Sequence, residues 1–191
     1  MQVSEKKTFD TAYLLTLLLP IIAAIILRLQ GRVWWCKIGD YAIWSSDIWG
    51  SHNSQHLFDP YTFTHILHGV LYFWLISLFL RNLPLSWKFF VAILIASGWE
   101  ILENSSFVIE HYRAETISLD YFGDSVINSV SDIFSCAFGF WLTYYLKFWR
   151  SLAFFVIVEI ILLLWIKDSL IVNIIMLVFP IEAIKNWQMG H

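Results

Sequence analysis

The chain has 191 residues, of which 59% are hydrophobic and only 14% are charged, and its net charge is −3. This apolar share exceeds that of an ordinary soluble domain and indicates an integral membrane protein. The sequence contains no run of basic residues and no glycine-rich phosphate loop, which argues against nucleic acid and nucleotides as partners. Its two cysteines, Cys36 and Cys136, match neither a disulfide framework nor a CxxC site.

Six segments of the chain are apolar and close to the roughly 20 residues that a spanning helix requires. The first follows Lys6 and Lys7 as a secretion signal would. Its apolar run is long, however, and no small-residue cleavage site follows it, so we expect a retained span. The sequence therefore predicts one all-α domain, a polytopic helical membrane bundle. The predicted spans cover residues 11–29, 61–80, 87–108, 125–148, 151–166 and 169–187.

The last two predicted spans are separated only by Lys167 and Asp168, and Pro180 interrupts the second, so this pair could also form a short or tilted hairpin. The expected orientation follows from the 12 Lys and Arg residues of the chain. With a cytoplasmic amino end, seven of them, including Lys185, lie on the cytoplasmic side and five on the other side. This small bias predicts a cytoplasmic amino end and places loops 30–60 and 109–123 outside.

Three of the predicted spans carry polar side chains near the outer face. Within each span they are spaced three or four residues apart: His65 and His68; Glu100, Glu103 and Asn104; Asp124, Asn128 and Asp132. These spacings put each set on one helix face. Carboxylates as deep as Glu100 and Asp132 are too costly to face lipid. We therefore expect the three faces to meet in an outward-facing polar pocket.

The residue types in this pocket suit acid–base or metal chemistry. We predict a catalytic core made of His65, His68, Glu100, Glu103, Asp124 and Asp132. His65, His68 and Glu103 could hold a divalent metal such as zinc, while without metal a His–carboxylate pair could act as general acid and base. The predicted substrate-binding residues are Arg113, whose planar fork suits an anion, with Asn104, Asn128, His111, Ser54 and His56. A pocket in this place would meet membrane lipids or a lipid-linked envelope substrate, so a hydrolase or transferase is the leading hypothesis.

Other interpretations of the same residues stay open. His65 and His68 could be packing residues, Glu100 and Glu103 could pair with Arg113 or His111, and Asp124 could cap a helix while Asn128 and Asp132 bond across helices. His52 and His56, four residues apart, are interpreted as loop residues that could share a short interfacial helix. The whole chain could instead be a small proton- or metal-linked transporter or a structural accessory protein. The oligomeric state is not predicted.

Three strings of the sequence resemble a known family: "NSQHLFDPYTFTHILHG", "GWEILENSSFVIEHYRAETISLDYFGDSVINSVSDI" and "FPIEAIKNWQ". The family comprises uncharacterised bacterial, chiefly proteobacterial, inner-membrane proteins, and the resemblance covers most of the chain from the first loop onward. It implies a location in the bacterial inner membrane. More remotely, the chain is similar to VanZ-like membrane proteins. The positions that carry this similarity are His65, His68, Glu100, Glu103, Arg113, Asp124, Asn128, Asp132 and Gly139. This second similarity implies a role in the cell envelope.

Overall fold

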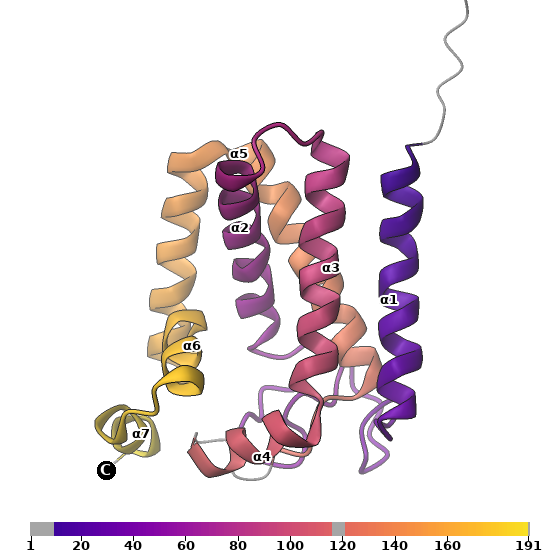
Figure 1. Cartoon of the computed structure of the whole chain (residues 1–191). Helices are drawn as coiled ribbons and strands as arrows, with labels where there is room; N and C mark the ends of the chain where they lie inside the picture. The colour runs from indigo at the N-terminus through magenta and orange to yellow at the C-terminus, as the bar shows by residue number, and fades with distance from the viewer. Residues whose placement is uncertain (1–9, 116–120, 191) are drawn as a thin grey trace, which may run out of the picture.

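The computed structural model describes residues 10–115 and 121–190, and the helices in these ranges are α1 (Thr11–Leu29), α2 (Thr62–Phe79), α3 (Leu85–Glu103), α4 (Ser106–Glu115), α5 (Val126–Ile166), α6 (Leu170–Val178) and α7 (Glu182–Met189). Extended pairing in these ranges is limited to one isolated bridge between Trp44 and Phe58. Figure 1 shows the long helices side by side, with α4, α6 and α7 gathered at the lower end of the bundle. The all-α prediction is confirmed.

Four of the described helices, α1, α2, α3 and α5, are long and apolar enough to cross a membrane. At most 33% of the residues in their most apolar windows are buried inside the protein. Large apolar side chains such as Leu17, Ile25 and Leu164 are instead more than half exposed. Apolar side chains on the outside suit lipid as the surrounding solvent, so the chain is a helical membrane bundle.

Helix α5 consists of two antiparallel legs that meet at Lys147, whose φ of 62° and ψ of 177° are not helical. Figure 1 shows α5 turning over at the top of the bundle. The second leg packs on α2, where the Trp74 indole donates to Ser151 Oγ at 3.1 Å. Each leg has about the length that a bilayer requires. The two legs correspond to the predicted spans 125–148 and 151–166.

Two glycines bring α2 and the first leg of α5 into close contact. A Cβ atom added to Gly139 would lie 1.9 Å from the carbonyl oxygen of Ile66, and one added to Gly69 would lie 2.0 Å from that of Cys136. Small residues at a helix crossing let backbones approach in this way, as is common between membrane helices. This crossing fixes where His65 lies relative to α5.

The structure differs from the predicted spans near the end of α3. This helix ends at Glu103 and not at Val108, because the side chain of the following Asn104 donates to the Glu100 carbonyl oxygen and to Asp124, which turns the chain into α4. Figure 1 shows α4 lying across the lower end of the bundle. Helix α1 has the predicted bounds, residues 11–29.

The predicted span 169–187 is divided into the short helices α6 and α7, neither of which is long enough to cross a bilayer. The break lies at Phe179 and Pro180, because proline cannot donate a helical hydrogen bond and disfavours helical geometry in the residue before it. Lys185 donates to the carbonyl oxygen of Ala114 at 2.7 Å and therefore lies beside α4. The prediction that Lys185 and Arg113 lie on opposite sides is wrong, and the basic residues then divide evenly between the two sides.

The long segment between α1 and α2 closes the lower end of the bundle. Ser125 N–H donates to the Ser54 carbonyl at 3.0 Å, and Val126 N–H donates to the Val33 carbonyl at 2.8 Å. The Gln55 amide donates to the Gly123 carbonyl at 2.8 Å. These contacts join the first loop to the start of α5. The loop therefore covers the polar residues described next, and we call this cover, residues 30–60, the roof.

Candidate functional site

His65 of α2 lies between two buried carboxylates on neighbouring helices. Its Nδ1 is 3.3 Å from Glu100 Oε1 of α3, and its Nε2 is 3.8 Å from Asp132 Oδ2 of α5. Glu100 is 1% exposed and Asp132 is 3% exposed. Glu100 Oε2 and Asp132 Oδ1 have no hydrogen-bond partner among the described residues. A carboxylate on each side of one imidazole can hold and exchange protons, or bind a cation, in a setting from which water is largely excluded.

A cavity of about 370 Å³ opens beside this group, between α2, α6 and the adjoining ends of α3, α4 and α5. Five of the six predicted catalytic residues line it: His65, His68, Glu103, Asp124 and Asp132. The sixth, Glu100, is the buried partner of His65. Much of the remaining lining is apolar and comes from Leu71, Leu75, Ile174, Leu177 and Val178. Along α2, His65 and His68 precede Leu71 and Leu75 by about one to two helical turns, so the cavity has a polar end and an apolar side.

The structure groups the possible metal ligands differently from the prediction. His65, Glu100 and Glu103 each offer a ligand atom, and these three atoms lie within 4.8 Å of one another. His68 does not belong to this group and stacks instead on Tyr72, with 5.7 Å between the ring centroids. Residues three apart on a helix differ by about 60° in direction, which is enough to turn His68 away from Glu100. Glu100 thus takes the place in the group that the sequence assigned to His68.

Asp124 joins the end of α3 to the start of α5. Its Oδ2 accepts from Asn104 Nδ2 at 2.8 Å, its Oδ1 accepts from the Tyr121 hydroxyl at 2.9 Å, and its own N–H donates to Asn104 Oδ1 at 2.7 Å. Burial raises the pKa of Asp124, while the hydrogen bonds from Asn104 and Tyr121 oppose that shift. Asp124 does not cap α5, because the hydroxyl of Ser125 accepts from Asn128 N–H and fills that position.

Of the six predicted substrate-binding residues, only Ser54 lines the cavity. Asn104 supports Asp124, and Asn128 donates to the His56 carbonyl at 2.8 Å, so both hold loops in place. His111 contacts the Leu177 carbonyl at 2.9 Å, Arg113 is exposed with its guanidinium over the ring of Phe122, and His56 belongs to a separate group in the first loop. The sequence spacing could not show these directions, because they depend on irregular segments.

The prediction omitted several polar residues of the cavity, among them Tyr112, Tyr121 and Asn173. The Tyr112 hydroxyl donates to Asn173 Oδ1 at 3.1 Å and so joins α4 to α6. Asn173 stands in the apolar string "LIVNIIMLV", and a lone amide in such a string could have indicated a polar interior contact. The tyrosines carry no comparable signal, since tyrosine is common at membrane interfaces.

The comparisons with known proteins identify the family of this chain. Residues 27–190 match the family described as "Protein of unknown function (DUF2585)". Three similar proteins, each named a UPF0314 protein, come from Paracoccus denitrificans, Sinorhizobium fredii and Rhizobium meliloti, at 42%, 44% and 41% identity. The alignments cover 92%, 90% and 88% of this chain and 91%, 88% and 86% of the relatives.

No solved structure matches the chain. The similarity to VanZ-like proteins stays a prediction. The family model covers most of the chain, and the relatives align over nearly their whole length at more than 40% identity. The chain therefore belongs to this uncharacterised family, in agreement with the first of the two resemblances in its sequence.

Proposed function

We propose that this protein binds an amphiphilic molecule, a lipid or a lipid-linked envelope intermediate, in the cavity and acts on its polar end as a hydrolase or transferase. The observation that carries the proposal is the division of the cavity lining. His65, His68 and Glu103 stand at one end, and the apolar side chains of α2 and α6 form the other side. A water-soluble substrate would gain nothing from the apolar side, whereas a lipid needs both.

The apolar side of the cavity continues onto the lipid-facing surface of the bundle. Leu75 of α2 is 49% exposed, and Ile174 and Val178 of α6 are 41% and 58% exposed, although all three line the cavity. A hydrocarbon chain could therefore enter sideways from the bilayer while its headgroup moves toward His65. This route avoids pulling the chain through water, which would cost about 0.8 kcal/mol for each CH₂ group.

The polar end offers a base and an acid for hydrolysis of a phosphate or acyl ester. In this proposal His65 accepts a proton from water, the water oxygen bonds to the phosphorus or carbonyl carbon, and the Glu103 carboxyl group gives its proton to the departing oxygen. Glu100 and Asp132 hold the imidazole and balance its charge when it is protonated. His65, Glu100 and Glu103 could instead hold a zinc ion, which would supply Lewis-acid activation of water at this end of the cavity.

The proposed location is the bacterial inner membrane, with the amino end in the cytoplasm and the cavity at the outer face. Helices α1, α2, α3 and the two legs of α5 then make five crossings. Thiol labelling tests this orientation in a chain that lacks its native cysteines. An impermeant maleimide should label Ser46→Cys, in the exposed first loop, in cells with a permeabilised outer membrane. It should label Asn82→Cys, between α2 and α3, only after the inner membrane is broken. The reverse pattern would place the cavity at the cytoplasmic face.

Mass spectrometry of organic extracts tests the function itself. Wild-type protein purified in mild detergent should carry an amphiphile that is enriched over the bulk membrane lipids. Ile174→Trp, which fills the apolar side of the cavity, should lose it. Leu17→Trp on the lipid-facing surface of α1 is the matched control and should keep it. Equal lipid content in all three proteins would remove the basis for an amphiphile site.

A second variant separates catalysis from binding. Glu103→Gln keeps the size of the side chain and removes its acid. In proteoliposomes made from total envelope lipids, the wild type should convert the bound species into a product with a different headgroup, and Glu103→Gln should retain the unconverted species. Vectorial loss of a solute from sealed vesicles without any new lipid product would support the transporter interpretation. Variants that lose only thermal stability would support a structural role.

A further inference from the structure

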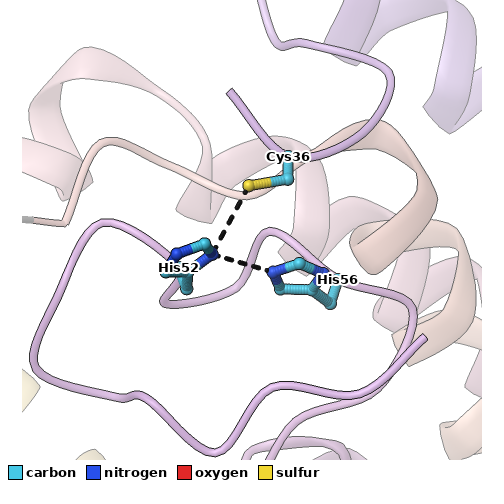
Figure 2. A group of neighbouring side chains, drawn as sticks. All are labelled: Cys36, His52 and His56. Atoms are coloured by element: carbon cyan, nitrogen blue, oxygen red, sulfur yellow. Dashed lines mark hydrogen bonds between the residues drawn. The ribbon is translucent and has the colours of Figure 1, made fainter. Parts of the chain in front are cut away.

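Three side chains of types that often bind metals meet in the first loop, in a group that shares no residue with the cavity. Figure 2 shows Cys36, His52 and His56 turned toward one another from separate stretches of this loop. Cys36 Sγ lies 3.6 Å from His52 Nδ1, and His52 Nδ1 lies 3.1 Å from His56 Nε2. All three ligand atoms lie within 4.8 Å of one another. The turn at residues 51–54 creates this arrangement, and the short interfacial helix that His52 and His56 could have shared does not form.

These separations fit a tetrahedral zinc site. With Zn–S near 2.3 Å and Zn–N near 2.05 Å, such a site places a sulfur and a nitrogen ligand about 3.5 Å apart and two nitrogen ligands about 3.3 Å apart. The observed distances of 3.6 Å and 3.1 Å are close to these values. A thiolate with two imidazoles is also the donor set that zinc prefers over magnesium or calcium.

The surroundings of His56 leave Nε2 as the ring nitrogen that can bind a metal. His56 is completely buried, and its Nδ1 lies 2.8 Å from the carbonyl oxygen of Ala42, which can only accept a hydrogen bond. Nδ1 must therefore carry a proton, so that in the neutral ring Nε2 is the nitrogen with the lone pair, and this nitrogen faces His52. A backbone carbonyl on the second ring nitrogen is a typical support for a metal-binding histidine.

Asp40 supplies a possible fourth ligand. Its Oδ2 lies 4.0 Å from His52 Nδ1 and 3.9 Å from His56 Nε2, while its Oδ1 accepts from Ala42 N–H at 2.9 Å. The same short segment therefore orients both the carboxylate and the ring of His56. The separations to Oδ2 exceed those of a closed tetrahedron, so a small rotation of the half-exposed Asp40, or a water molecule, would complete the coordination.

We propose that Cys36, His52 and His56 bind a zinc ion, with Asp40 or water as the fourth ligand. Binding displaces the proton of the Cys36 thiol to solvent, so that a thiolate faces the metal. The ion would tie residues 36–40 to residues 52–56. Ser54 and Gln55 hold the start of α5 through Ser125 and Gly123, and Ser54 lines the cavity. The metal would therefore stabilise the roof of the cavity, a role that does not depend on the proposed function.

Cobalt spectroscopy on the full-length protein in detergent tests this proposal. Cobalt added to metal-free wild type should give intense visible bands of tetrahedral Co²⁺ and a near-ultraviolet sulfur-to-cobalt charge-transfer band, and one equivalent of zinc should remove both. Cys36→Ser should lack the charge-transfer band and bind zinc at least about tenfold more weakly. Cys136→Ser, which changes the buried cysteine of α5, is the matched control and should keep the complete spectrum.

Two further variants keep the test decisive. His52→Gln alters a side chain that is 31% exposed, so it should fold even if Cys36→Ser does not, and it should lose the tetrahedral bands. His65→Gln changes the other possible metal group and should keep the charge-transfer band. Absence of cobalt bands in the wild type, unchanged binding in folded Cys36→Ser or His52→Gln, or loss of metal only in His65→Gln would overturn the proposal.

Discussion

Replacement of Gly139 by alanine should separate α2 from α5. The added Cβ would lie 1.9 Å from the Ile66 carbonyl oxygen, whereas real Cβ contacts essentially never fall below 3.0 Å. The helices would therefore have to move apart by about 1 Å, because neither backbone can rotate out of the way. Such a gap forfeits about a quarter to a half of the dispersion energy of each contact across it. Overpacking of this kind typically costs about 1–3 kcal/mol, and backbone-to-backbone contact favours the upper end.

The same movement would disturb the candidate site, because His65 on α2 faces Asp132 on α5 at 3.8 Å. We expect Gly139→Ala to lower the unfolding free energy in detergent by about 3 kcal/mol and to reduce amphiphile retention. The assay is unfolding in increasing denaturing detergent, followed by tryptophan fluorescence and repeated at two protein concentrations to exclude a change of association.

Gly98→Ala is the matched control for this experiment. Gly98 lies on the exposed face of α3, and a Cβ added there meets nothing within 4 Å. Alanine also favours a helix over glycine by up to about 1 kcal/mol, so this variant should be as stable as the wild type or slightly more stable. If Gly139→Ala and Gly98→Ala unfold alike, the close crossing of α2 and α5 does not determine stability and the reasoning fails.

Three more predictions concern the buried carboxyl group of Asp59, the side-chain amide of Asn104 and the turn of α5 at Lys147. Burial, with a smaller contribution from Asp124, raises the pKa of Asp59 from 3.8 to about 7. Because the folded protein binds this proton more tightly than the unfolded chain, protonated Asp59 stabilises the fold. This stabilisation is complete below about pH 4 and is lost as the pH rises through about 7. Asp59→Asn should flatten the dependence of unfolding free energy on pH between 4 and 8, whereas the exposed Glu110→Gln should leave the slope unchanged. Asn104→Ala removes the amide that bonds both Asp124 and the Glu100 carbonyl and should cost about 2–4 kcal/mol of unfolding free energy; a loss below about 0.5 kcal/mol would contradict a role in joining α3 to α5. Lys147 has a positive φ angle that only glycine adopts easily, so Lys147→Gly should raise the thermal unfolding midpoint. Arg150→Gly, three residues later in a regular helix, should lower that midpoint.

The sequence was most informative where local periodicity carries the information. The bounds of α1 agree with the prediction because an apolar run between polar ends needs no partner to define it. The sequence also predicted that the polar faces of α2, α3 and α5 meet, because a carboxylate such as Glu100 must avoid lipid. This constraint acts on each helix separately, so spacing alone expresses it.

Residues in loops and at helix ends were harder to place. Arg113 and His111 stand on α4, which exists only because Asn104 ends α3 through a contact with Asp124, 20 residues away. The sequence could not show that contact, since it depends on how the helices pack. For the same reason, five of the six predicted substrate-binding residues do not line the cavity.

The amino-acid sequence by itself determined that this is an all-helical membrane protein with a polar interior, because hydrophobicity and helical spacing are properties of short segments. Only the tertiary structure decided that α6 contributes the apolar side of the cavity and that Cys36 meets His52 and His56. Such contacts join residues that are distant along the chain. They arise from the positive φ angles of turns, the close crossing at Gly69 and Gly139, and the first loop folding over the start of α5, none of which a local pattern encodes.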